Sequence, residues 1–281
     1  MQSVSQFQEQ VPIKSDTRQN RVRLRPVALP VEHGGWGFSL EPVALGLLVA
    51  PSLLGLFLSV TTLAAFLARH PLKIAMSDRQ RGRRLLRTPI AERFALLYMT
   101  ISLVSFLAAI KTAPSYEFLL PLLLASPLAL IQLLFDRMSR SRALLPELAG
   151  ATAMASIAMS IALADGWQSS LAFGLWAILA ARAVPSVLYV RARLKRLHRQ
   201  EASTSKTIVI HVLAIAAASV LAWAKLVPVL SVVALSILLA RTVYGFSRYD
   251  RQATARLIGF RELGFGAMMV AAVALGHYFN L

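Results

Sequence analysis

Two ionisable residues fall inside apolar stretches of the sequence, where a charge is costly to place. Glu41 lies near the end of Pro30-Val-Glu-His-Gly-Gly-Trp-Gly-Phe-Ser-Leu-Glu-Pro42, and Arg182 lies within a long apolar block. An ionised side chain at the centre of a bilayer costs roughly 2.5–3.5 kcal/mol on insertion scales, so it is usually paired or lines a wet cavity. We therefore expect Glu41, Arg182, Glu32 and His33 to form one polar site.

These candidates also have a purely structural interpretation. Glu32 could cap the first turn of a helix, because oxygen-bearing side chains satisfy free amide groups there. A buried Arg182 requires an anionic partner, and the resulting ion pair could hold helices together without any ligand. The candidate partners are Glu41, Glu147 and Glu262.

A second set of candidates is basic and lies where apolar blocks end. Arg69, His70 and Lys73 share the stretch Arg69-His-Pro-Leu-Lys73, and Arg191 follows the apolar block that contains Arg182. A guanidinium group binds phosphate through paired hydrogen bonds, so these residues are candidate contacts for an anion or a lipid headgroup. The alternative is that they only set membrane topology and contact anionic lipid without specificity.

Several kinds of chemistry are excluded by what the sequence lacks. It contains no cysteine, which removes disulfides, thiolate catalysis and cysteine-bound metals. It contains no Walker phosphate loop, no HExxH zinc motif and no GxSxG nucleophile elbow. We therefore expect no metal site and no cofactor, and whether the protein is an enzyme stays open. The net charge of +17 comes without a nucleic-acid recognition motif, so we expect no nucleic-acid partner.

Hydropathy shows which elements must position these residues. Hydrophobic residues make up 57% of the chain, and they gather in blocks that approach the length of about 20 residues needed to cross a bilayer. We expect an all-α, polytopic transmembrane bundle of about nine helices. The expected helices cover residues 34–50, 52–68, 92–110, 117–135, 144–164, 168–190, 207–224, 226–243 and 257–280. The division at Lys225 is the least defined, since one long helix with a re-entrant piece there would reduce the count to eight.

The basic residues lie on one side of this predicted bundle. All lysines and arginines except Lys111, Lys225 and Arg182 fall at segments that nine crossings place on the same face. Positive loops remain on the cytoplasmic side, so we expect the N-terminus inside and the C-terminus outside. Residues 1–30 would then form a flexible basic cytoplasmic tail, and residues 31–281 a single transmembrane helical domain.

The opening segment Pro30-Val-Glu-His-Gly-Gly-Trp-Gly37, with Glu41-Pro42 and Gly46-Leu-Leu-Val-Ala-Pro51, resembles the bacterial YwiC-like membrane family. The stretches 69–73, 78–84 and Tyr189-Val-Arg-Ala-Arg193 are similar to the same family, and the likeness spans roughly residues 26–270. The resemblance implies a multi-pass protein of the bacterial inner (plasma) membrane, and it implies no particular activity.

A more distant resemblance is to the UbiA superfamily of membrane prenyltransferases. It rests on the two largest basic loops, which follow the second and sixth predicted helices, and on Arg25-Pro26 before the first. The resemblance implies nine helices around a central cavity that those loops cover. The superfamily binds magnesium and a prenyl diphosphate through aspartate-rich motifs in the two loops. Here the first loop has only Asp78 and the second has no aspartate, so magnesium-dependent diphosphate chemistry is not expected.

Three hypotheses for the function remain. The first is an enzyme, or a degenerate enzyme, that binds or processes a lipid-soluble substrate with an anionic head. The second is a transporter or permease for a small anion, and the third is a non-catalytic membrane factor that binds a partner enzyme. We see no internal repeat, which would favour a transporter. The expected partners are the bilayer, anionic lipid headgroups and a lipid-like small molecule.

Overall fold

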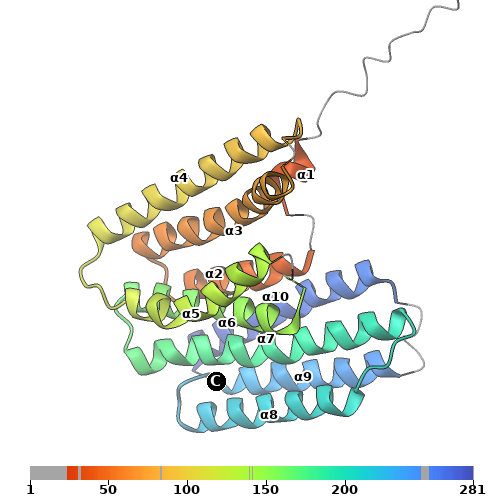
Figure 1. Ribbon diagram of the computed structural model, residues 1–281. Coiled ribbons are helices and arrows are strands. Elements are labelled where there is room, and N and C mark those ends of the chain that lie inside the picture. The colour runs from red at the N-terminus through yellow and green to blue at the C-terminus, as the bar shows by residue number, and fades with distance from the viewer. Residues whose placement is uncertain are drawn as a thin grey trace, which may run out of the picture.

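The computed structural model describes residues 24–30, 33–82, 84–138, 140, 142–247 and 253–280, without the side chains of residues 33–35. Within these residues the chain forms helices joined by turns, and no strand is present (Figure 1). The helices are α1 (Arg25–Ala28), α2 (His33–Val49), α3 (Leu53–Gln80), α4 (Thr88–Thr112), α5 (Leu119–Arg137), α6 (Leu144–Ala164), α7 (Ser169–Leu197), α8 (Thr204–Trp223), α9 (Val229–Phe246) and α10 (Ala255–Phe279).

The nine predicted apolar blocks correspond to α2 to α10, so the polytopic helical bundle expected from the sequence is confirmed. Among the described helices, the eight from α3 to α10 are long and apolar enough to cross a membrane. The apolar part of α2, Trp36–Val49, is shorter than these eight. At the least defined division, Lys225 adopts a left-handed conformation with a φ of 58° in a turn between α8 and α9. The segment around Lys225 therefore forms two helices rather than one.

Local sequence explains where several helices start and turn. The Ser52 side chain accepts a hydrogen bond from the Gly55 amide at 3.1 Å, and Thr254 does the same for the Leu257 amide at 3.3 Å. Hydroxyl side chains at this position satisfy amide groups that a helix start leaves unpaired. Between α6 and α7 the chain reverses at Gly166, whose φ of 86° is accessible mainly to glycine. Short connections of this kind make consecutive helices antiparallel neighbours.

Helices α6 and α7 form the centre of the bundle. α6 packs against α2, α3, α5 and α7, while α7 also contacts α8, α9 and α10 (Figure 1). A Cβ atom on Gly46 or on Gly55 would lie only 2.9 Å or 2.8 Å from the Ile161 side chain, so α2 and α3 approach α6 closely at glycines. α10 lies beside both α2 and α7. This arrangement brings the first and last apolar helices together at the centre.

Helix α4 lies at the periphery, because of the described helices it contacts only α3 and α1. Its remaining surface exposes large apolar side chains such as Leu96, as expected for a helix in contact with lipid tails. The short helix α1, within the segment expected to be a tail, packs Val27 against Ala75 of α3 and Ala91 of α4. Residues 1–23 of that predicted tail lie outside the described residues.

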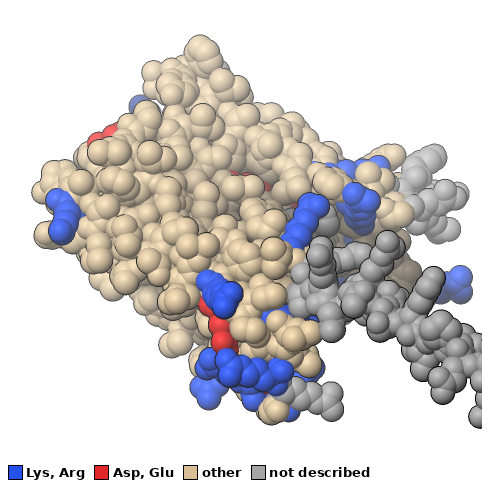
Figure 2. All heavy atoms as spheres, turned by 90° about the horizontal axis from the view of Figure 1, so that it is seen from above, with Lys and Arg blue, Asp and Glu red and all other residues tan. Residues whose placement is uncertain are grey.

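Basic side chains gather toward one end of the bundle. In Figure 2 most of the visible Lys and Arg lie toward the right and lower edges of the view, and the rest of this surface consists almost entirely of other residues. The turn that joins α3 to α4 carries Arg81, Arg84 and Arg87, whereas the turn that joins α8 to α9 carries only Lys225. The α3–α4 turn is therefore much more basic than the α8–α9 turn.

Candidate functional site

Glu41 and Arg182, two of the four residues predicted to share a polar site, form an ion pair. Arg182 Nη2 of α7 lies 3.0 Å from Glu41 Oε1 of α2, and the side chains are only 2% and 9% exposed. Glu41 lies directly before Pro42 in α2, and Arg182 lies three residues before Pro185 in α7. A proline inside a helix removes a backbone hydrogen bond and bends the helix, so both charges lie near local irregularities of the backbone.

A second ion pair lies directly beside the first. Arg241 Nη2 of α9 donates hydrogen bonds to Glu262 Oε2 of α10 and to Ser186 Oγ of α7, both at 3.2 Å. Arg182 Nη2 also donates to the backbone carbonyl of Glu262 at 3.0 Å, which links the two pairs. We call Glu41, Arg182, Arg241 and Glu262 the central charge cluster. It joins α2, α7, α9 and α10 through two positive and two negative side chains.

Aromatic rings and one glycine shape this cluster. The guanidinium carbon of Arg182 lies 5.3 Å from the ring centre of Phe38, and that of Arg241 lies 4.0 Å and 5.2 Å from the rings of Tyr189 and Phe265. Such cation–π contacts stabilise guanidinium groups away from water. A Cβ atom on Gly266 would lie 2.0 Å from Glu41 Oε1, so only a glycine leaves room for the carboxylate there.

The cluster keeps unused hydrogen-bonding capacity. Within the described residues, five polar atoms of the cluster are buried and have no hydrogen-bond partner: Arg182 Nε, Arg241 Nε, Arg241 Nη1, Glu41 Oε1 and Glu262 Oε1. Buried polar groups in folded proteins are almost always hydrogen-bonded to protein or water. The guanidinium groups therefore offer three donor nitrogens to any anionic or polar group that reaches the cluster.

The other two residues of the predicted polar site cannot be compared with this geometry. Glu32 lies outside the described residues, and of His33 only the helical backbone is described, at the first position of α2. His33 begins the helix about two turns before Glu41, since one turn contains 3.6 residues.

The predicted headgroup contacts on α3 are engaged in bonds within the protein. Arg69 Nε and Nη2 donate to the two carboxylate oxygens of Asp136 on α5, at 2.5 Å and 3.0 Å. Lys73 Nζ lies 3.9 Å from the same carboxylate, and His70 Nε2 lies 3.0 Å from the carbonyl oxygen of Pro26. These side chains therefore tie α3 to α5 and to α1.

Arg191, the fourth predicted headgroup contact, is also paired. Its Nη1 donates to Glu147 Oε2 and to the carbonyl oxygen of Arg142, both at 2.8 Å. Both side chains are about one third exposed, so this pair lies nearer the surface than the central charge cluster. Glu147, at the start of α6, thus pairs with the end of α7 rather than with Arg182.

Asp78, the single aspartate of the basic segment after the second apolar block, is enclosed by its neighbours. Its carboxylate accepts hydrogen bonds from Arg87 Nη2 at 2.7 Å, Arg87 Nε at 3.1 Å and Thr88 Oγ1 at 3.0 Å. The hydrogen bonds that Arg87 donates to Asp78 raise the pKa of Arg87. No group of three or more His, Asp or Glu side chains in the described part of the chain is arranged to hold a metal ion.

Three members of the site were not among the predicted site residues: Arg241, Ser186 and Glu262, of which Glu262 was named only as a candidate partner of Arg182. Arg241 counted as a loop cation, because the expected helix ended soon after it. The segment that follows it, Thr242-Val-Tyr-Gly-Phe246, is apolar or aromatic apart from its threonine, and it continues α9 for five more residues. This apolar segment after Arg241 is the feature of the sequence that indicates that Arg241 lies inside a helix.

Comparison with known proteins adds one finding to this geometry. Residues 29–162, from the end of α1 into α6, match the family described as YwiC-like protein. No curated protein and no solved structure matches the chain. The matched segment contains Glu41 and Asp136 together with the α3–α4 hairpin, so this part of the chain is similar to the YwiC-like family.

Proposed function

We propose that the protein binds a lipid-soluble ligand with an anionic head, and that the head binds at the central charge cluster. The observation that carries this proposal is the set of three guanidinium nitrogens, on Arg182 and Arg241, that are buried without a hydrogen-bond partner among the described residues. A buried donor that lacks a partner costs about 1–3 kcal/mol. A carboxylate or phosphate head carries enough oxygens to satisfy these donors.

The position of the cluster favours a ligand with an apolar tail. The cluster lies between membrane-spanning helices, and aromatic side chains such as Phe38 and Phe265 pack against its cations. Glu262 is its most exposed member at 12% of the side chain, and nearby Phe260 on the same helix is also exposed. A ligand that enters beside Glu262 would therefore keep its tail among apolar groups.

The basic end of the bundle supports the choice of an anionic head. Arg241 lies five residues before the end of α9 and Glu262 lies seven residues after the start of α10, at the end that carries the basic turns. Clustered positive charge raises the local concentration of anions. By the positive-inside rule this end faces the cytoplasm of a bacterial plasma membrane, which is part of the proposal.

The test is identification of the lipids that remain bound after purification. The wild type and Arg241→Gln are purified in the same mild detergent, and bound lipids are extracted and identified by mass spectrometry. We expect an anionic lipid to be enriched in the wild type and depleted in the variant. Arg241→Lys keeps the charge but loses the planar fork, so an intermediate depletion is expected.

The matched control is Arg196→Gln, which removes one cation from the exposed end of α7. Arg196 donates to the Phe246 carbonyl at 3.2 Å and lies outside the central charge cluster. The control should retain the enriched lipid. Equal lipid content in the wild type, Arg241→Gln and the control would rule out the proposed binding site.

A small-anion transporter is the second candidate, and one observation favours it. The four charges of the central charge cluster come from four different helices, α2, α7, α9 and α10, so a shift of one helix pair against the other would open the site. Anion flux into proteoliposomes that Arg182→Gln abolishes would favour transport, whereas an enriched lipid without flux favours the first proposal. Neither result is expected of a non-catalytic membrane factor.

A further inference from the structure

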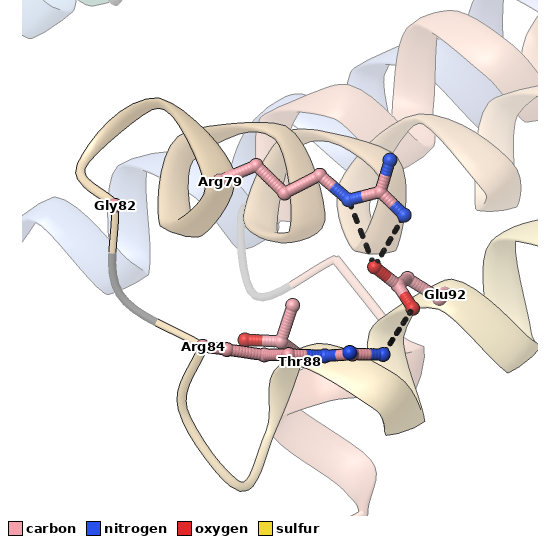
Figure 3. Close-up of a pocket in the computed structure, with 5 residues that line it drawn as sticks. All are labelled: Arg79, Gly82, Arg84, Thr88 and Glu92. Atoms are coloured by element: carbon pink, nitrogen blue, oxygen red, sulfur yellow. Dashed lines mark hydrogen bonds and ion pairs between the residues drawn. The ribbon is translucent and has the colours of Figure 1, made fainter.

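A basic pocket lies at the turn between α3 and α4, away from the central charge cluster. It has a volume of about 300 Å³, and its lining residues are Arg79, Gly82, Arg84, Thr88 and Glu92. Figure 3 shows the Arg79 and Arg84 side chains approaching the Glu92 carboxylate from opposite sides, one from α3 and one from the turn. Gly82, with a φ of 63°, reverses the chain so that the two arginines face the same carboxylate.

The charges in this pocket do not balance. Arg79 Nε and Nη2 both donate to Glu92 Oε1, at 3.0 Å and 2.7 Å, and Arg84 Nη2 lies 4.0 Å from Glu92 Oε2. The arginine side chains are 71% and 80% exposed, so their remaining donors face solvent. One glutamate therefore pairs with two arginines, so among the described residues that line the pocket one positive charge has no counter-ion.

The surroundings of the pocket place it at the surface of a membrane. Helix α3 has 28 residues and is about 42 Å long, which exceeds the roughly 30 Å thickness of a bilayer core, so its basic end reaches the headgroup layer. Next to the pocket the turn exposes Leu85 and Leu86, and Leu86 is 65% exposed. Exposed leucines beside arginines form the pattern of a segment that inserts apolar side chains while its cations contact headgroups.

We propose that the α3–α4 turn is a binding site for the phosphate group of an anionic phospholipid. Arg79 and Arg84 would each donate to a phosphate oxygen, and Leu85 and Leu86 would contact the acyl chains of the same leaflet. Glu92 would act as an internal counter-ion that the headgroup displaces. The proposal does not depend on the central charge cluster.

Two features favour a lipid over a free anion as the source of the phosphate. The exposed leucines have no use in binding inorganic phosphate, but they follow Arg84 directly in the chain and could contact the acyl chains of a lipid whose headgroup occupied the pocket. The aspartate nearest the pocket, Asp78, is neutralised by Arg87 and does not oppose an incoming anion. A lipid headgroup is therefore the occupant that uses both the charge and the apolar surface.

The experiment measures binding of short-chain phosphatidylglycerol to the full-length protein in neutral detergent by native mass spectrometry. A double variant removes the two arginines of the pocket, and a single variant removes the charge of the carboxylate that they share. Arg79→Gln with Arg84→Gln should weaken binding about 30-fold, since a basic residue near the surface contributes about 1 kcal/mol toward an anionic lipid. Glu92→Gln should instead tighten binding, up to about fivefold, because the competing carboxylate charge is removed.

The control pair is Arg199→Gln with Lys206→Gln, which removes the same charge from the exposed α7–α8 turn and the exposed start of α8. It should change binding less than twofold. If Glu92→Gln weakens binding as the arginine variants do, the ion pair is only structural and the proposal fails. The proposal also fails if the control weakens binding equally, or if inorganic phosphate competes with phosphatidylglycerol at equal concentration.

Discussion

Arg182 of α7 and Glu41 of α2 form an ion pair in the interior of the bundle, and the backbone of α10 passes directly against it at Gly266. The same arginine donates to the carbonyl oxygen of Glu262, whose own carboxylate binds Arg241. Four helices from the first to the last of the bundle are thus held by one set of charges. A change in one member should therefore be felt by the others, which makes the cluster suitable for mutational coupling experiments.

The first prediction concerns the coupling between the two members of this pair. Arg182→Ala should lower the free energy of unfolding by about 3–5 kcal/mol, because it leaves the Glu41 carboxylate buried without its partner. Adding Glu41→Ala should restore part of the loss. Chemical unfolding in mixed micelles, applied to the wild type, both single variants and the double variant, measures this difference.

The pair between Arg191 and Glu147 provides the control for that cycle. Because both side chains are about one third exposed, Arg191→Ala should cost no more than about 1 kcal/mol. If the Arg182 and Glu41 changes are additive, the two residues do not share an energetically coupled site.

The second prediction uses two glycines of α10. Gly266→Ala places a methyl group 2.0 Å from Glu41 Oε1, so it should force the ion pair apart and lower thermal stability. Gly264→Ala meets no atom within 4 Å and should be neutral or stabilising, by up to about 1 kcal/mol, because alanine favours helix. Thermal unfolding of both variants in the same detergent provides the comparison, and equal effects would contradict the described packing.

The third prediction concerns topology. Reporter fusions after Arg84 and Arg196 should give a cytoplasmic signal, and fusions at Thr112 and Leu281 should give an external signal. The reason is that the positively charged turns are retained inside the cell. A cytoplasmic signal at Leu281 would mean that one of the nine apolar helices does not cross, and the short α2 would then be the first to examine.

The fourth prediction concerns magnesium. The Asp78 carboxylate is already bound by Arg87 and Thr88, so magnesium with a prenyl diphosphate should give no saturable increase in the melting temperature. Asp78→Asn should lower the melting temperature, because a buried charged hydrogen bond is lost, whereas Asp165→Asn at an exposed turn should not. A large stabilisation by magnesium and the diphosphate would restore the prenyltransferase interpretation.

Hydropathy predicted the helices well and their polar ends poorly. The expected blocks ended at residues 68 and 190, but α3 continues to Gln80 and α7 to Leu197. These extensions are basic, so a search for apolar residues does not detect them. They are nevertheless helical, since arginine and lysine are good helix formers and a helix can continue past the apolar layer.

The candidate site was predictable only where a charge interrupts an apolar run. Glu41 and Arg182 meet that condition, and Glu262 was a candidate partner of Arg182. Arg241 was classified as a loop residue because it lies near the end of its apolar block. The pairing of Arg69 with Asp136 and of Arg191 with Glu147 depends on which helices become neighbours in space. A single sequence carries no signal for that choice.

The balance of charge in the central charge cluster has a consequence for the response to membrane voltage. Moving one elementary charge through the full membrane field changes the energy by about 2.3 kcal/mol per 100 mV. Each pair, Arg182 with Glu41 and Arg241 with Glu262, carries no net charge when its members move together. These four side chains therefore contribute no gating charge to a displacement of α9 and α10 past α2 and α7. Any voltage dependence of such a movement would come from charges other than these four side chains.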